Sequence, residues 1–187
     1  MSLNDKLRAL RAGAQARLDP ASWSGLSRTI EWLRMRQLAE HSLGAGDVLP
    51  DFELQDEQGQ AVGSGELLDR APLVLTFFRG GWCPYCSTTM RELEATRPEL
   101  ESLGATLVGI VPTKPSELAR IRAERGLGFR LLSDRGGHLA RLCGVFYTMS
   151  PAQVAYYRDQ CGLDLPAMGA DTDWELPQGS RIRPIRS

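Results

Sequence analysis

Two cysteines separated by two residues are the part of this sequence best suited to chemistry. Cys83 and Cys86 occur in the segment Trp-Cys-Pro-Tyr-Cys. Two cysteines at this spacing at the start of a helix can come within the Cα separation of about 4.4–6.8 Å that a disulfide requires. Because thiolates attack oxidants and disulfides, the pair predicts a reversible dithiol–disulfide switch, and both residues are candidate catalytic groups.

The position of the pair along the chain favours a thiolate. Residues 73–78 form an apolar, strand-favouring run without alternation, as expected for a central strand buried on both faces. From residue 84 to about residue 103 the apolar residues recur at helical spacing. The pair therefore lies where a strand meets a helix. Unpaired N–H groups and the positive end of the helix dipole at that point lower the pKa of a thiol below its free value of about 8.5.

Three neighbours of the cysteines are candidate substrate-binding residues. Arg79 adds positive charge near the sulfur atoms, and Trp82 can form an apolar wall beside them. Pro84 suits the first helical position because it lacks the N–H that would be unpaired there. Two of them also have a purely structural interpretation: Arg79 can be a solvated surface residue, and Trp82 can be a packing residue.

The remaining cysteines and the two histidines offer less. Cys143 lies in an apolar stretch and is expected to be a buried small hydrophobic residue, whereas Cys161 is a possible resolving partner in an irregular region. A structural zinc site needs a second C-x-x-C pair or suitably spaced histidines, and neither is present. His138 is expected to bond to the backbone at a helix start, and both His138 and His41 offer little for acid–base catalysis. No metal and no cofactor are therefore predicted.

Around this pair the chain divides into three parts. Residues 1–43 carry two amphipathic helical patterns, the second opening at Asp19, a suitable N-cap, and Pro20. We assign them to a helical N-terminal extension, which packs on the domain or pairs with another copy. Residues 44–177 form the main domain, and residues 178–187 form an irregular tail.

The main domain alternates strands and helices. A short hairpin is predicted over residues 52–62, before the strand at 73–78. Further strands are predicted at 105–111 and 129–132, and further helices at 115–125 and 137–143. Strands that alternate with helices form crossover units. The sequence thus predicts an α/β fold with a mostly parallel central sheet flanked by helices.

Charge and hydropathy exclude several other functions. The 187 residues include 22 basic and 23 acidic side chains, for a formal net charge of −1. Nucleic-acid binders and membrane-surface proteins need a basic excess, so neither partner is expected. No apolar run approaches the roughly 20 residues that span a bilayer, and the charged start of the chain does not look like a secretory signal. A cytoplasmic location, where cysteines stay reduced, is expected.

The strand, the C-x-x-C helix and the crossover after it resemble the thioredoxin superfamily, and specifically its peroxiredoxin branch of alkyl hydroperoxide reductases and thiol-specific antioxidants. The resemblance runs from Pro50-Asp-Phe-Glu-Leu through the cysteine pair to Leu131-Leu-Ser-Asp and Gly144-Val145, in peroxiredoxin order. It implies a thioredoxin-like fold and an antioxidant, thiol-dependent oxidoreductase. Such an enzyme reduces hydroperoxides through Cys83 and Cys86 and is recharged by a thiol electron donor.

The resemblance leaves open which cysteine attacks. Cys86 occupies the position of the peroxidatic cysteine, which attacks peroxide and becomes a sulfenic acid. Arg79 and Cys83 stand where the family motif P-x-x-x-T-x-x-C has proline and threonine. In the thioredoxin pattern, Cys83 would attack instead. Two alternative functions follow: a thioredoxin-like protein-disulfide oxidoreductase, and a catalytically weak partner-binding module on the same fold.

The end of the chain departs from the family. Peroxiredoxins usually continue after the position of Pro177 with a proline-containing loop, two antiparallel strands and a final helix. Residues 178–187 show no strand or helix pattern. We therefore expect the C-terminal hairpin and helix to be missing and one edge of the sheet to be open. A second copy could cover such an edge, which would make a homo-oligomer.

Overall fold

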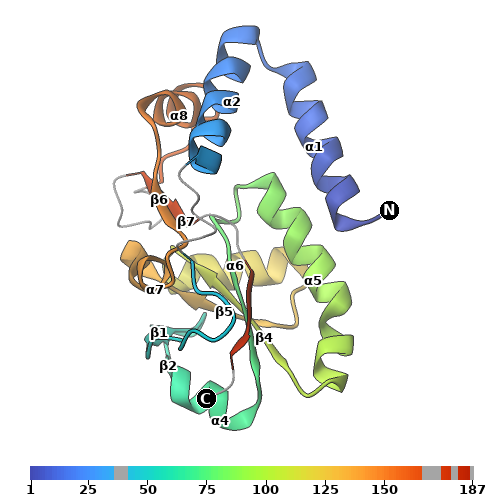
Figure 1. The fold of residues 1–187 in the computed structure, drawn as a ribbon, viewed down its shortest axis with the longest axis vertical. Helices are drawn as coiled ribbons and strands as arrows, with labels where there is room; N and C mark the ends of the chain where they lie inside the picture. The colour runs from blue at the N-terminus through green and yellow to red at the C-terminus, as the bar shows by residue number, and fades with distance from the viewer. Residues whose placement is uncertain (36–41, 166–173, 178–180, 186–187) are drawn as a thin grey trace.

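The computed structural model describes residues 1–35, 42–165, 174–177 and 181–185. Two helices, α1 (Leu3–Arg17) and α2 (Pro20–Met35), form the N-terminal extension and lie at one end of an α/β body (Figure 1). The carboxylate of Asp19 accepts hydrogen bonds from the N–H groups of Ala21 and Ser22, both at 3.0 Å. These contacts confirm the predicted N-cap of the second helix.

The main sheet has six strands in the order β2-β1-β5-β4-β3-β8. Their bounds are β1 (Glu53–Gln55), β2 (Ala61–Gly63), β3 (Leu73–Phe77), β4 (Thr106–Val111), β5 (Arg130–Ser133) and β8 (Arg181–Ile185). Strands β3, β4 and β5 are parallel, as predicted for the centre of the sheet. The hairpin β1–β2 and strand β8 join antiparallel, so the sheet is mixed rather than mostly parallel. The tight turn of the hairpin imposes the antiparallel pairing there.

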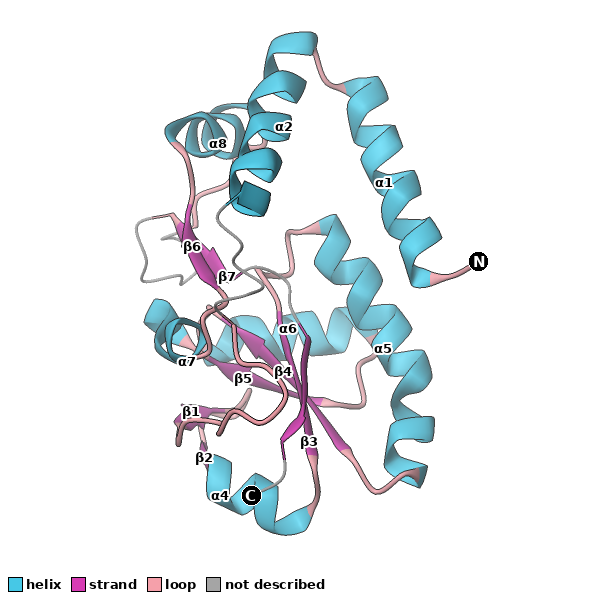
Figure 2. Ribbon diagram, in the orientation of Figure 1, coloured by secondary structure: helices cyan, strands magenta, loops and turns pink. Residues whose placement is uncertain are grey.

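Helices cover both faces of this sheet (Figure 2). They are α4 (Ser64–Arg70), α5 (Pro84–Ser102), α6 (Pro115–Arg125) and α7 (His138–Leu142). Alternate residues of β4 enter opposite cores: Val108 and Ile110 join one cluster, and Leu107 and Val111 join the other. This explains the continuous apolar run of that strand. Both cysteines of the pair belong to the second core, which α5 helps to form.

Residues 181–185 of the predicted irregular tail form a strand, which corrects the prediction for this part of residues 178–187. Strand β8 pairs antiparallel with β3, with Leu73 opposite Ile185 and Thr76 opposite Arg181. The outer edge of β3 presents unpaired N–H and C=O groups, and an extended segment satisfies them whatever its side-chain pattern. The open edge at β3 that motivated a homo-oligomer is therefore covered by the chain itself. The alternative of a catalytically weak partner-binding module relied on the same open edge, so it loses that support.

A second, smaller unit was not predicted. Strands β6 (Phe146–Thr148) and β7 (Glu175–Pro177) pair antiparallel, beside helix α8 (Pro151–Ala155) and a π-helical turn (Tyr156–Gln160). Its apolar core is built from Tyr147, Met149, Leu165 and Leu176. Trp82 packs against this core, which brings the unit to the start of α5. Strands of three residues are too short to show a sequence period.

The length and polarity of the helices bear on membrane insertion. In the part of the chain that the structure describes, every helix is too short or too polar to cross a bilayer.

Candidate active site

The end of β3 and the start of α5 position the cysteine pair. Cys83 is the N-cap of α5, with φ −84° and ψ 117°, and Pro84 is the first helical residue. Cys86 lies in the first turn, where the backbone N–H of Arg79 donates to its Sγ at 3.3 Å. Both sulfur atoms are reduced. The strand-to-helix junction therefore has the form that the sequence predicts.

The two sulfur atoms differ in their access to solvent. Cys83 is 1% exposed and Cys86 is 5% exposed. A cavity of about 440 Å³ is lined by Cys86, and Cys83 is absent from its lining. Arg79 and Tyr85 also line it. A small molecule in this cavity would meet Cys86 first.

The two thiols share one proton. The S–H of Cys86 donates a hydrogen bond to Cys83, and this lowers the pKa of Cys83 to about 5 against the opposing effect of burial. The charge of Arg79 and the N–H groups of Cys86 and Tyr85 lower it further. The same hydrogen bond, burial and the charge of Cys83 raise the pKa of Cys86. These effects together favour the thiolate form at Cys83 and the thiol form at Cys86.

Arg79 and Trp82 both lie beside the pair. The Cζ atom of Arg79 is 6.0 Å from the centre of the Trp82 ring. The positive charge of Arg79 opposes the rise in the pKa of Cys86 as well as lowering that of Cys83. The Trp82 ring meets the Tyr157 ring edge-on, with 5.3 Å between ring centres. Arg79 therefore supplies charge to the site, and Trp82 connects the cysteine turn to the smaller unit.

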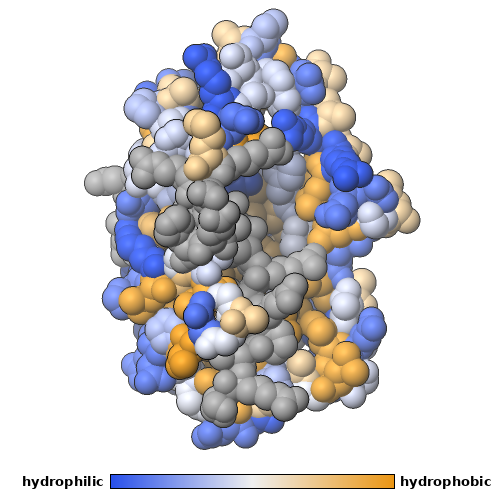
Figure 3. Space-filling view, in the orientation of Figure 1, coloured by the Kyte–Doolittle hydropathy of each residue, from blue (hydrophilic) through white to orange (hydrophobic). Residues whose placement is uncertain are grey.

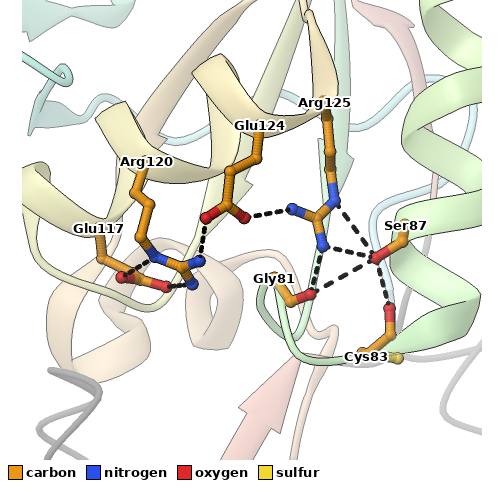
Figure 4. A network of polar contacts seen from close by, with 7 residues as sticks. All are labelled: Gly81, Cys83, Ser87, Glu117, Arg120, Glu124 and Arg125. Carbon is orange, nitrogen blue, oxygen red and sulfur yellow. Dashed lines mark hydrogen bonds and ion pairs between the residues drawn. The ribbon is translucent and has the colours of Figure 1, made fainter.

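A hydrogen-bond network from α6 holds this turn (Figure 4). The guanidinium of Arg125 donates to the carbonyl of Gly81 at 2.5 Å and to the hydroxyl of Ser87 at 2.9 Å. Ser87 in turn donates to the carbonyl of Cys83 at 3.1 Å. A side chain at Gly81 would place its Cβ 2.8 Å from Ile121, so the close approach of α6 requires glycine there. Arg125 thus fixes the backbone from which both sulfur atoms project.

Three further residues at the site, Arg125, Ser87 and Tyr157, were not among the candidates predicted from the sequence. Arg125 lies 44 positions from Gly81, and no local motif links the two. Tyr157 comes from the unpredicted smaller unit, and burial raises its pKa to about 12. The polar residue that directly follows the C-x-x-C pair, one turn after Cys83, is the only local signal, and it points to Ser87 alone.

The remaining candidates lie away from the pair or outside the described residues. Cys143 is buried, and burial raises its pKa to about 12, which agrees with its predicted role as a packing residue. Cys161 is exposed. His138 begins α7, and His41 lies outside the described residues. Within the described ranges, no three histidine, cysteine or acidic residues gather as metal ligands would.

Comparison with known proteins identifies consistent similarities. Residues 45–162 match the family model described as the AhpC/TSA family. Peroxiredoxin Bcp of Escherichia coli is 32% identical over 104 residues, which are 56% of this chain and 66% of that protein. A putative peroxiredoxin of Mycobacterium tuberculosis is 34% identical over 92 residues, which are 49% of this chain and 58% of that protein. The chain thus matches just under two thirds, or less, of the length of these relatives.

Solved structures agree with these similarities. Peroxidoxin BcpB from Mycobacterium tuberculosis superimposes with a TM-score of 0.53 at 30% identity, over 56% of this chain and 68% of that one. A PrxQ mutant of Xylella fastidiosa superimposes with a TM-score of 0.51 at 22% identity, over 60% of this chain and 69% of that one. The second likeness supports the fold alone.

Proposed function

Because the chain belongs to the AhpC/TSA family, we propose that it is a thiol peroxidase that reduces hydroperoxides through Cys86 and Cys83. One observation carries this proposal. Cys86, at the peroxidatic position of the family motif, lines a cavity, and its neighbour Cys83 has a pKa lowered to about 5. The proposal therefore assigns the attack on peroxide to Cys86.

The reaction starts with a proton transfer inside the pair. The Cys83 thiolate takes the proton of Cys86 as the Cys86 sulfur attacks the hydroxyl oxygen of the hydroperoxide ROOH. The O–O bond breaks, Cys86 becomes a sulfenic acid, and the departing alkoxide takes the proton from Cys83 and leaves as ROH. The Cys83 thiolate then attacks the sulfenic sulfur. The Cys83–Cys86 disulfide forms, and hydroxide leaves and is protonated to water. The pair has lost two electrons to the peroxide.

This mechanism gives a role to each departure from the family motif. Cys83 stands where the motif has threonine, and as a thiolate it can act as base and then as resolving group. Arg79 stands where the motif has proline, and its charge favours the anionic form of the pair. A thiol electron donor reopens the disulfide by exchange, which completes the cycle.

Oxidation by a single equivalent of hydrogen peroxide tests the proposed function. We expect the four thiols to fall to two, the protein to lose the mass of two hydrogens, and peptide mapping to place the new bond between Cys83 and Cys86. Cys143 and Cys161 should remain free thiols. A protein that keeps all four thiols, or that forms only intermolecular disulfides, would contradict the mechanism.

A second function is favoured by the pKa of Cys83. A depressed pKa at the N-cap is what a thioredoxin-like disulfide reductase needs, with Cys83 as the attacking group. Its exposure of 1% opposes this, because a protein disulfide must reach the attacking sulfur. Reduction of insulin by the thiol form, compared with reduction of hydrogen peroxide, separates the two functions. We expect peroxide to react much faster.

The rate of oxidation by peroxide should depend on pH in an unusual way. The pair stays monoanionic above the lowered pKa of Cys83, about 5, and it becomes neutral as the pH falls through that value. We therefore expect a rate that is nearly constant from pH 6 to 8 and half-maximal near pH 5, in single-turnover measurements. An unperturbed thiol, with a pKa of about 8.5, would instead lose about tenfold per pH unit below pH 8. That second profile would show that the pair does not share its proton as described.

A further inference from the structure

We propose that helix α1 forms part of the active site, where Leu3 and Leu7 select hydroperoxides that carry an apolar body over hydrogen peroxide. This inference rests on the proposed function and adds a specificity element to it. The helix precedes residues 45–162, which match the family model, so the family resemblance does not supply this wall.

The cavity at Cys86 lies between two elements that are distant in sequence. Leu3, Asn4 and Leu7 line it from α1, and Arg79 and Cys86 line it from the other side. The molecular surface is hollowed beside the N-terminal helices (Figure 3). Its volume of about 440 Å³ falls in the usual range of small-molecule sites, roughly 300–1,000 Å³. The space greatly exceeds what hydrogen peroxide needs.

Helix α1 is held in place beside α5. The Nζ atom of Lys6 and the Oε1 atom of Glu92 form an ion pair at 2.5 Å, and both side chains are about one-third exposed. Figure 1 shows the first turns of α1 facing α5. Leu3 and Leu7 are four residues apart and therefore share one face of the helix. The ion pair and this apolar face fix which residues of α1 meet the cavity.

The two walls of the cavity suit the two ends of an organic hydroperoxide. Arg79 and Cys86 offer charge and the reacting sulfur to the hydroperoxyl group. Leu3 and Leu7 offer apolar surface to the alkyl or aryl body, which gains from leaving water. Hydrogen peroxide has no such body and gains nothing from these leucines. The preference for organic hydroperoxides should therefore appear as a higher kcat/KM for an organic hydroperoxide relative to kcat/KM for hydrogen peroxide.

The same helix supplies a matched control. Leu10 lies one turn further along α1, is half-buried like Leu7, and lines a different hollow with Thr88 and Arg91. That hollow has no cysteine in its lining. Substituting Leu10 by alanine removes the same side-chain atoms from the same helix without touching the cavity at Cys86.

The test compares kcat/KM for cumene hydroperoxide with kcat/KM for hydrogen peroxide. In Leu3→Ala/Leu7→Ala we expect the ratio to fall about tenfold, mainly through KM for cumene hydroperoxide. In Leu10→Ala we expect the ratio of the wild type. A second variant, Leu7→Trp, should lower the ratio by filling the cavity, even if the double variant loosens α1.

Two results would overturn the inference: an unchanged ratio in both Leu7 variants, which includes an equal loss for both peroxides, or the same change of ratio in Leu10→Ala. Each of these leaves peroxidase activity measurable. If the wild type consumes neither peroxide, the proposed function itself fails, so the two failures are distinguishable.

Discussion

Substituting Cys86 by serine should lower the rate of peroxide consumption by at least about 100-fold, because it removes the sulfur that lines the cavity. Substituting Cys83 by serine should have a different result. The Cys86 sulfur remains, so the protein reacts once, but it lacks the base that removes its proton and slows by about 100-fold. With no resolving thiol beside it, the reaction stops at the sulfenic acid.

The measurement follows both the rate and the product. Single-turnover oxidation by hydrogen peroxide gives the rate. Dimedone, a nucleophile specific for sulfenic acids, labels the oxidised cysteine, and mass spectrometry of the adduct identifies that cysteine. We expect one adduct, on Cys86, in Cys83→Ser, and none in the wild type, where the disulfide forms first. The variant Cys161→Ser, which removes an exposed thiol, should behave as the wild type in both respects.

The opposite pattern would reassign the attack. If Cys86→Ser reacts quickly and accumulates a sulfenic acid on Cys83, while Cys83→Ser is inert, the thioredoxin-like assignment of Cys83 as nucleophile is correct. If both single variants react as fast as the wild type, the pair is not the reacting centre and the proposed function fails.

The second large effect should come from Arg125, to which no local sequence pattern points. In Arg125→Met the carbonyl of Gly81 and the hydroxyl of Ser87 both lose a charged donor. Hydrogen bonds to charged groups contribute about 1.5–3 kcal/mol each, so the loss of two should lower the free energy of unfolding by roughly 3 kcal/mol or more. The freed turn also holds Cys83 less rigidly at the N-cap, which should raise the pKa of its thiol.

Arg120 on the same helix gives the control (Figure 4). It pairs with Glu117 and Glu124 at the surface, and its side chain is 52% exposed. Glu124 also pairs with Arg125, at 3.6 Å, but Arg120 itself reaches only these two glutamates of its own helix in Figure 4. Exposed pairs of this kind contribute about 0.3–0.5 kcal/mol each, so Arg120→Met should lose less than about 1 kcal/mol. Urea unfolding and the ultraviolet absorbance of the thiolate against pH measure the two effects.

The two readouts separate positioning from simple stability. Loss of stability without a change in the thiolate titration would make Arg125 a purely structural residue. A raised titration midpoint in Arg125→Met, and an unchanged midpoint in Arg120→Met, would support the positioning role. Equal effects of both variants would contradict it.

Local sequence pattern was sufficient for the central elements and for the cysteine pair. Three features lie within one short stretch of the sequence: the apolar run of β3, Pro84, and the helical pattern of apolar residues that follows it. The helix shows a period of 3.6 in its side chains, and the strand is recognised by its continuous run of apolar, strand-favouring residues. The same is true of the helix starting at Pro20, whose cap is the residue before it.

Pattern was insufficient where structure depends on backbone pairing between distant segments. Strand β8 was predicted as an irregular tail, yet it pairs with β3 because an unpaired strand edge accepts any extended chain. Strands β6 and β7 are three residues each, and their partner residues lie far apart in sequence. Neither pairing leaves a period in the side chains.

The sequence by itself determined that two thiols would stand at a strand-to-helix junction, because neighbouring residues specify that junction. Only the tertiary structure decided how the two thiols differ. Cys86 faces a cavity lined by α1, Cys83 has its pKa lowered by Cys86 and Arg79, and Arg125 holds the turn from α6. These contacts join segments that the chain order keeps apart. The pKa of a thiol and its access to substrate depend on such neighbours in space, which no local motif records.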